Sequence, residues 1–290
     1  MKEIIPTYSI SNLSKQKGND PDFFLLTEKV DTSKAAFNLP FRSHYYGVGI
    51  CLQGKAELKA NLESYTVIPN SIVAMSPQII KQWIYMSDDF KTSTIFFTKE
   101  FITTNNFLNL NNFSYFESVA QHCFSTNDHQ ASIILASLNF IKEKYEAVRF
   151  FREEILKSLT NVLLYDINSI YVQEHFISNS ILTRAKSLSS DFKKLVNIHF
   201  SKERSVKFYA DVLNITPKHL TETVKHVTGK TAGEWIDDTV ILEAKVLLQN
   251  PNLTISQIAD ILHFSDQSIF GKFFKNLNGL SPIAYRQSLS

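Results

Sequence analysis

A segment of the C-terminal part of the chain occurs twice, and this duplication constrains the fold more than any other feature of the sequence. Residues 206–216 recur as residues 255–265, with Ala, Asp and Leu kept at equivalent places and most other positions preserved in character. The apolar residues of each copy fall at i, i+3, i+4 and i+7, which is the spacing of one face of a short helix. They are Val206, Tyr209, Ala210 and Leu213 in the first copy and Ile255, Ile258, Ala259 and Leu262 in the second.

The residues at the ends of each short helix favour its start and its stop. Ser205 and Thr254 lie where a helix needs an N-cap side chain, and Gln257 completes a capping box with Thr254. The helices end at Asn214 and His263, which are residue types that tolerate a positive φ better than most non-glycine residues. The chain is therefore expected to turn sharply at both places.

A second helix is predicted after each turn, beginning at Thr216-Pro217 in the first copy and at Ser265-Asp266 in the second. From this point the repeat offset grows by one residue, so the second turn has gained a residue. Helix, tight turn and second helix form a helix-turn-helix motif, and two such units are predicted. The equivalent residues of the second helices and beyond are Leu220 and Phe270, Val224 and Phe274, Lys225 and Lys275, Gly229 and Gly279, and Trp235 and Tyr285.

A longer apolar pattern connects the two units. Ile236, Val240, Ala244 and Leu247 recur at helical spacing and mark one helix that ends at Asn250-Pro251. Such a stiff helix would fix the spacing between the units. Two recognition helices joined in this way are expected to enter successive major grooves on one face of DNA, about 34 Å apart.

The C-terminal region resembles the DNA-binding domain of the AraC/XylS family of bacterial transcription regulators. The match covers roughly residues 191–288 and is closest over 255–286. The family pattern ends in a Gly, a Ser-Pro pair and a Tyr-Arg pair, which stand here as Gly279, Ser281-Pro282 and Tyr285-Arg286. The resemblance implies a transcription regulator whose partners are double-stranded promoter DNA and RNA polymerase. It also implies an N-terminal cupin-like domain that senses a small-molecule effector, forms a homodimer, or does both.

The chain departs from the family pattern at two positions. His263 stands where the family usually has Gly, and backbone geometry tolerates this change. Val240 stands where the linking helix of the family often has Arg, so a phosphate contact or a packing contact would be missing here.

The first hundred residues predict short strands separated by turns. Strands are expected at 45–52, 56–60, 65–68, 72–75, 79–85 and 92–97. Strands at this spacing favour a sandwich or a barrel. The resemblance implies a cupin-like β-barrel, and the segment 41–46, followed by Gly54 and Pro69-Asn70, is similar to that domain.

Two amphipathic helices are predicted after the strands. They either cover the barrel or offer part of their surface to a dimer contact. The apolar positions are Ile134, Leu138, Ile141 and Tyr145 in the first helix and Phe151, Ile155, Leu159, Val162 and Leu163 in the second.

The chain is therefore predicted to be an α+β protein of two domains. At 290 residues it exceeds the size at which single cores usually stop growing. We expect a cupin-like effector or dimerisation domain at 1–178, a linker rich in Ser, Asn and Thr at 179–190, and a DNA-binding domain at 191–290. Residues 181–290 carry 14 Lys or Arg against 10 Asp or Glu, which is +4, and the rest carries 16 against 18, which is −2. This asymmetry has the direction expected for a DNA-binding C-terminal half.

The candidates for DNA contact are the exposed residues in the predicted recognition helices, because the first two turns of such a helix meet base edges. The alternative for each is a solvated polar side chain without a role in binding. We expect base readout from Lys218, Thr221 and Glu222 in the first unit and from Gln267, Ser268 and Lys272 in the second, and phosphate contacts from Lys225 and Lys275.

An effector pocket is proposed in the barrel on four residues, Arg42, His44, Tyr46 and Trp83, with Arg42 pairing with an anionic group. The alternative is that these are ordinary barrel or surface residues. Histidines and cysteines show no metal-ligand spacing, so we expect no metal, no cofactor and no enzyme activity. The rival hypothesis is a small-molecule-binding or catalytic cupin-like protein whose helical domain serves protein association.

The sequence also bears on location. It shows no secretory signal and no apolar run near the roughly 20 residues that span a bilayer. We therefore expect a cytoplasmic protein without a membrane partner.

Overall fold

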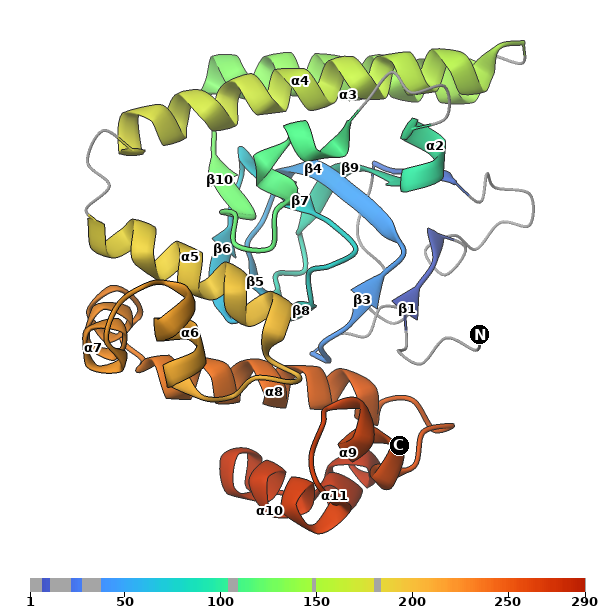
Figure 1. The fold of residues 1–290 in the computed structure, drawn as a ribbon. Helices are drawn as coiled ribbons and strands as arrows, with labels where there is room; N and C mark the ends of the chain where they lie inside the picture. Colours follow the sequence, from blue (N-terminus) through green and yellow to red (C-terminus); the bar gives the residue numbers. More distant parts are fainter. Residues whose placement is uncertain are drawn as a thin grey trace. The chain divides into compact units, whose positions relative to one another are not determined.

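The computed structural model of the chain describes residues 7–10, 22–27, 38–103, 109–147, 150–179 and 184–289. It divides into two compact units, one containing Thr7–Ser180 and the other Ile181–Ser290, here called the β domain and the helical domain. The chain is thus an α+β protein of two domains, as the sequence predicts (Figure 1). Within the described part, no helix is both long and apolar enough to span a membrane.

The strands of the β domain form a larger and a smaller antiparallel sheet. The five-stranded sheet has the order β10 (Cys123–Ser125), β7 (Ser71–Met75), β4 (Tyr45–Gln53), β9 (Lys91–Thr98) and β2 (Phe23–Leu26). The three-stranded sheet has the order β6 (Glu63–Val67), β5 (Ala56–Ala60) and β8 (Lys81–Met86). Short parallel strands β1 (Thr7–Tyr8) and β3 (Arg42–Ser43) form a separate pair.

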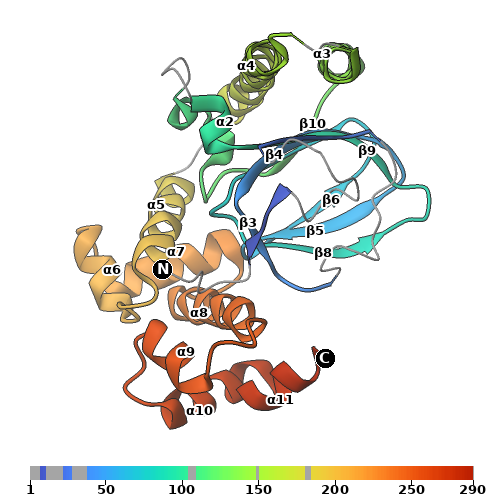
Figure 2. The same cartoon turned by 90° about the vertical axis from the view of Figure 1, so that its right-hand side faces the viewer.

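The closed barrel expected from the resemblance is not confirmed. Among the described residues, no strand-to-strand pairing joins the five-stranded sheet to the three-stranded one, so the two sheets face each other as open layers (Figure 2). Phe41 and Lys81 form an isolated antiparallel bridge between the segment before β3 and strand β8. The strands themselves lie close to their predicted positions.

Strand alternation gives the central strand β4 two different environments. Even-numbered residues such as Val48 and Ile50 belong to the core under the helices. Odd-numbered residues Tyr45, Gly47 and Gly49 face the space between the two sheets, because successive side chains of a strand point to opposite faces. Gly49 is required there, since a Cβ would lie 2.2 Å from the Thr94 hydroxyl oxygen.

Two long helices, α3 (Asp128–Ala147) and α4 (Arg152–Asn179), cover the outer face of the five-stranded sheet (Figure 1). The stripe predicted for α3 is confirmed, because Ile134, Leu138 and Ile141 are buried. The stripe predicted for α4 is wrong at two positions. Phe151 precedes the helix and is 75% exposed, and Val162 is 55% exposed. Leu163 is buried as predicted, on a face of α4 that also contains Leu156, Leu164, Ile167, Ile170 and Tyr171.

Shorter elements join the last long strand to these helices. Helix α2 (Lys99–Thr103) follows β9 directly, and the 3₁₀ turns η1 (Leu110–Asn112) and η2 (Ser114–Phe116) precede β10. Phe101 of α2, Phe113 between the two 3₁₀ turns and Tyr115 of η2 are buried in the core beneath α3 and α4.

The helical domain begins earlier than the sequence suggests. Helix α5 (Arg184–His199) starts inside the segment 179–190 expected to be a linker, because Ser189, Phe192 and Val196 form a buried face that extends back into it. The first helix-turn-helix follows as α6 (Val206–Val212) and α7 (Pro217–Thr228). Helix α8 (Ala232–Leu248) leads to the second, formed by α9 (Ile255–Ile261) and α10 (Gln267–Asn278), and α11 (Pro282–Gln287) closes the domain.

Both tight turns have the backbone that their residue types predict. Asn214 has φ 54° and His263 has φ 52°, so neither turn uses glycine. The N-caps at Ser205 and Thr254 are confirmed, and Thr254 forms the capping box with Gln257. The duplicated segments are therefore two helix-turn-helix units.

Replacing His263 with glycine should stabilise the helical domain by about 0.5–1 kcal/mol, because relief of the left-handed strain outweighs the added freedom of the unfolded chain. His263→Ala keeps a Cβ at the same φ and should give no gain. The measurement is urea unfolding in a Trp83→Phe background. It is monitored by the fluorescence of Trp235, which is buried in this domain. Equal stability of the Gly and Ala variants would contradict the assignment of strain.

Candidate nucleic-acid interface

The two recognition helices, α7 and α10, start at different kinds of N-cap. The Thr216 hydroxyl accepts a hydrogen bond from the backbone N of His219 at 3.2 Å. The Asp266 carboxylate accepts two, from the backbone N of Ser268 at 2.7 Å and of Ile269 at 2.8 Å. Both helices therefore begin where the sequence places them, after the positive-φ turn.

The C-terminal ends of α7 and α10 are alike. Gly229 and Gly279 are left-handed C-caps with φ 79° and 81°. Each donates its backbone N–H to a carbonyl four residues back, at Lys225 and Lys275 respectively, over 2.9 Å. The glycines match because a residue with a Cβ would be strained at this φ.

One face of each recognition helix is buried and holds the unit together. Leu220 and Val224 of α7 are fully buried, and so are the equivalent Phe270 and Phe274 of α10. The aromatic pair is larger, and Phe270 also packs against Phe264 of the preceding turn, with 5.2 Å between ring centroids. The opposite face of each helix carries the predicted contact residues.

The predicted contact residues of the first unit interact with one another. Lys218 and Glu222 are exposed, and their charged groups lie 4.0 Å apart, one helical turn from each other. The Thr221 hydroxyl donates a hydrogen bond to the carbonyl of Pro217 at 2.8 Å, so in this conformation its proton is bonded to the helix backbone. Lys225 is exposed one turn further along.

The predicted contact residues of the second unit lie together. Gln267, Ser268, Lys272 and Lys275 are all exposed and line one shallow hollow of about 300 Å³. Gly271 lies in the same hollow, where a Cβ would meet nothing within 4 Å. Lys272 and Lys275 form no ion pair within the part of the chain that the structure describes.

Some residues of this surface were not predicted. Ser281, the N-cap of α11, and Pro282 and Ile283 in its first turn line the same hollow as α10, and Ile283 is 54% exposed. The helical pattern of α10 cannot indicate them, because they come from the next helix. His219 is exposed in the first turn of α7, beside Lys218, and its place in the first turn was a signal that could have indicated it.

The repeat places opposite charges at one equivalent position. The offset that relates Leu220 to Phe270 relates Glu222 to Lys272, so the same place in the two recognition helices is acidic in α7 and basic in α10. The exposed face of α7 therefore has a partly neutralised charge, whereas the charged side chains within α10 are both lysines. The two units are not electrostatically equivalent.

Two arginines tie the second unit to the rest of the helical domain. Arg204 stacks on Phe264, with its guanidinium carbon 3.5 Å from the ring centroid, and donates a hydrogen bond to the carbonyl of Leu262. Arg286 of α11 donates from Nε to the carbonyl of Leu248 at 3.1 Å. Val240 is fully buried in the core of α8, α9 and α10, so this position contributes packing and is not open to a phosphate.

The four residues proposed for an effector pocket are not brought together. Trp83 lines a cavity between the two sheets of the β domain. Tyr46 lies on the opposite face of β4, stacked on Phe97 at 5.6 Å between ring centroids. His44 is exposed and Arg42 is half-buried, and neither lines the cavity.

Comparison with known proteins matches the helix-turn-helix region. A family described as a helix-turn-helix domain covers residues 209–288. The chain is 27% identical over 128 residues to the Msm operon regulatory protein of Streptococcus mutans, a match that covers 43% of this chain and 46% of that protein. It is 38% identical over 73 residues to the transcriptional activator AarP of Providencia stuartii, covering 25% of this chain and 54% of AarP.

A solved structure is similar over more of the chain. ToxT from Vibrio cholerae is 18% identical, with a TM-score of 0.40, over 93% of this chain and 94% of the ToxT chain. The chain spans about half the length, or less, of the first curated relatives that it matches. By name, the first of the two curated relatives described above is an operon regulatory protein and the second is a helix-turn-helix transcriptional activator.

Gly271→Ala should stabilise α10 by about 0.5–1 kcal/mol, because glycine in a helix interior costs backbone entropy and the added methyl enters open space. Gly279→Ala is the matched control and should lose stability, because its φ is positive. Urea unfolding followed through Trp235 measures both. A loss of stability in Gly271→Ala would show that the hollow is not open.

Proposed function

We propose that this chain, whose helix-turn-helix region belongs to the AraC/XylS family, is a transcription regulator that binds promoter DNA through α7 and α10. The observation that carries the proposal is the exposed basic surface of α10, where Lys272, Lys275, Gln267 and Ser268 share one hollow. Polar side chains and ammonium groups on an exposed helix face are the groups that read base edges and neutralise phosphates.

The roles of the two recognition helices follow from their charges. In α10, Gln267 and Ser268 in the first turn would meet base edges, with Lys272 one turn later and Lys275 on phosphate. In α7, Lys218 and Glu222 pair with each other, so each charge is partly neutralised in the free protein. Glu222 repels phosphate and can accept a hydrogen bond from cytosine N4. We therefore expect α10 to supply more of the affinity and α7 to supply selectivity.

The β domain is proposed to sense a small-molecule effector or to mediate dimerisation, with RNA polymerase as a further partner of the regulator in the cytoplasm. The cavity between the two sheets supports effector binding, because it is apolar and lies inside a domain separate from the recognition helices. A homodimer would double the number of recognition helices on one promoter.

Lys275→Ala removes a proposed phosphate contact and should lower the salt dependence of DNA binding. Each lost contact reduces the slope of log K against log salt concentration by about 0.9. We expect Lys272→Ala to weaken binding more than Lys218→Ala, because Lys218 is already paired with Glu222. Fluorescence anisotropy on a duplex obtained by in vitro selection, at several salt concentrations, measures affinity and slope together.

The matched control is Lys59→Ala, which removes the same charge from an exposed position of β5 in the other domain. It should leave both affinity and slope unchanged. Salt-insensitive binding by the unmodified chain, or failure of in vitro selection to enrich any duplex, would contradict the proposed function.

Exchanging the charges at the equivalent positions should change affinity in opposite directions. Glu222→Lys should strengthen binding to all duplexes and weaken the preference for the selected one, whereas Lys272→Glu should abolish most binding through repulsion of phosphates. Glu57→Lys on β5 is the control for a general change of net charge. Competition with a scrambled duplex gives the specificity ratio, and a weaker Glu222→Lys complex would refute the assigned role of Glu222.

A further inference from the structure

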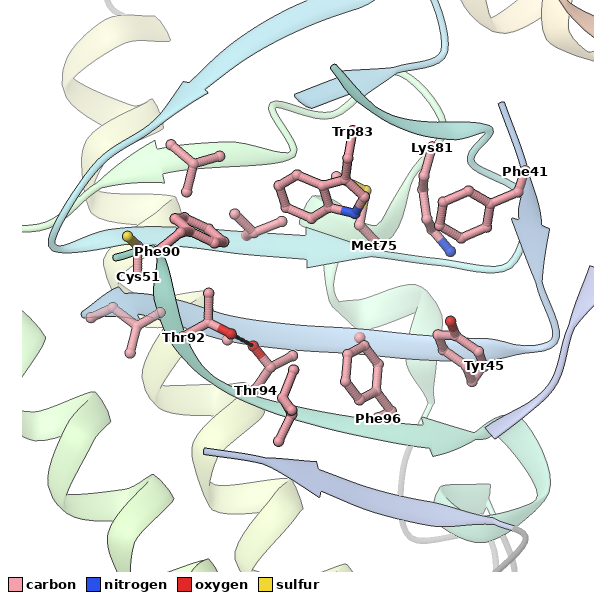
Figure 3. Close-up of a pocket in the computed structure, with 16 residues that line it drawn as sticks. Phe41, Tyr45, Cys51, Met75, Lys81, Trp83, Phe90, Thr92, Thr94 and Phe96 are labelled. Carbon is pink, nitrogen blue, oxygen red and sulfur yellow. Dashed lines mark hydrogen bonds between the residues drawn. The ribbon is translucent and has the colours of Figure 1, made fainter. Parts of the chain in front are cut away.

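The cavity of the β domain is small and almost entirely apolar. It has a volume of about 140 Å³ and lies between the five-stranded and three-stranded sheets (Figure 3). An engineered protein cavity of roughly 150 Å³ holds a benzene molecule. The lining includes aromatic rings, branched aliphatic side chains and a thioether, among them Phe41, Val73, Met75, Trp83, Phe90 and Phe96.

Among the residues that the structure describes, one charged side chain lines this cavity. Lys81, the first residue of β8, is 5% exposed, and its ammonium lies 5.4 Å from the ring centroid of Tyr45 and 6.0 Å from that of Phe41. Figure 3 shows the three side chains grouped at one end of the space. The sequence does not indicate the burial of Lys81, because a lysine on a short strand is ordinarily exposed.

The Lys81 ammonium is incompletely satisfied. It donates a hydrogen bond to the Ser43 hydroxyl, but a protonated lysine has three donors. Within the described part of the chain, no carboxylate forms an ion pair with it. A buried charge without an opposite charge is costly, and a bound anion would compensate it.

We infer that this cavity binds a small carboxylate with an aromatic or branched aliphatic body, its carboxylate on Lys81 and its body between Met75, Trp83 and Phe96. The volume sets the size of the body at about one ring. The apolar lining supplies the contact surface and the ammonium supplies the specificity for an anion. Binding itself does not depend on the proposed function, and only the role of the carboxylate as an effector rests on it.

The protonation of Lys81 makes binding sensitive to pH. Burial lowers the pKa of Lys81 to about 7, and the charge of Arg42 acts in the same direction. Burial also lowers the pKa of the nearby His122 to about 4 and raises that of Tyr45, so these two groups stay neutral between pH 6 and 8. Because the carboxylate binds the protonated amine, affinity should fall as the pH rises above about 7.

The test uses sodium benzoate and the full chain in a Trp235→Phe background, so that Trp83 alone reports binding by fluorescence. We expect saturable binding at pH 6 that weakens toward pH 8. Lys81→Met keeps the length of the side chain and removes the charge, and it should weaken benzoate binding by at least about tenfold while leaving toluene binding equal or stronger. Lys59→Met, the same change on the exposed face of β5, should behave as the unmodified chain.

Several results would overturn the inference. These are no Trp83 response to benzoate, phenylacetate or isovalerate, an unchanged benzoate affinity in Lys81→Met, or palmitate displacing benzoate as a stronger ligand. Removing a buried charge does not threaten folding, and the urea midpoint of Lys81→Met confirms that the variant is folded. If the unmodified chain binds benzoate but binds no DNA duplex, the proposed function is refuted and this inference stands.

Discussion

The helical domain depends on the burial of one helix, α8, between the two helix-turn-helix units. It contacts α5 and α7, and its C-terminal half shares a core with α9 and α10. Ile236, Val240, Ala244 and Leu247 are fully buried along its length. Because every turn of the helix is anchored by apolar contacts, the two recognition helices cannot change their spacing without opening a core. The arrangement is therefore set by packing and not by surface charges.

The parts of this domain that the sequence predicts are those controlled by local physics. Three features depend on residues close together in the chain: the period of α8, the N-caps at Ser205 and Thr254, and the positive φ of Asn214 and His263. The duplication adds a second, independent example of each local rule. Because the two copies agree at each of these positions, the sequence alone is enough to assign both helix-turn-helix units.

The β domain was predicted less well because its decisive features come from distant contacts. Whether Tyr45 or Tyr46 enters the cavity depends on which face of β4 the helices cover, and alternation alone does not say. The buried face of α4 was misjudged at Val162 because apolar residues lie on both sides of that helix. Lys81 was overlooked because its burial comes from residues of β3 and β4, which are distant in the sequence and pack across β8. The DNA contacts of α7 and α10 remain predictions; all of the proposed contact residues are exposed except Thr221, which is half-buried.

The single residue gained in the second turn has a consequence for the electric field at the two helix ends. A helix N-terminus carries a partial positive charge of about half an elementary charge and attracts phosphate. In α10 that end is already occupied by the Asp266 carboxylate, which cancels the helix dipole and takes two of its free N–H groups. In α7 the neutral Thr216 takes one N–H group and leaves the dipole uncompensated. The helix with the weaker side-chain charge thus keeps the stronger backbone field, so each unit attracts a polyanion by a different part of its structure.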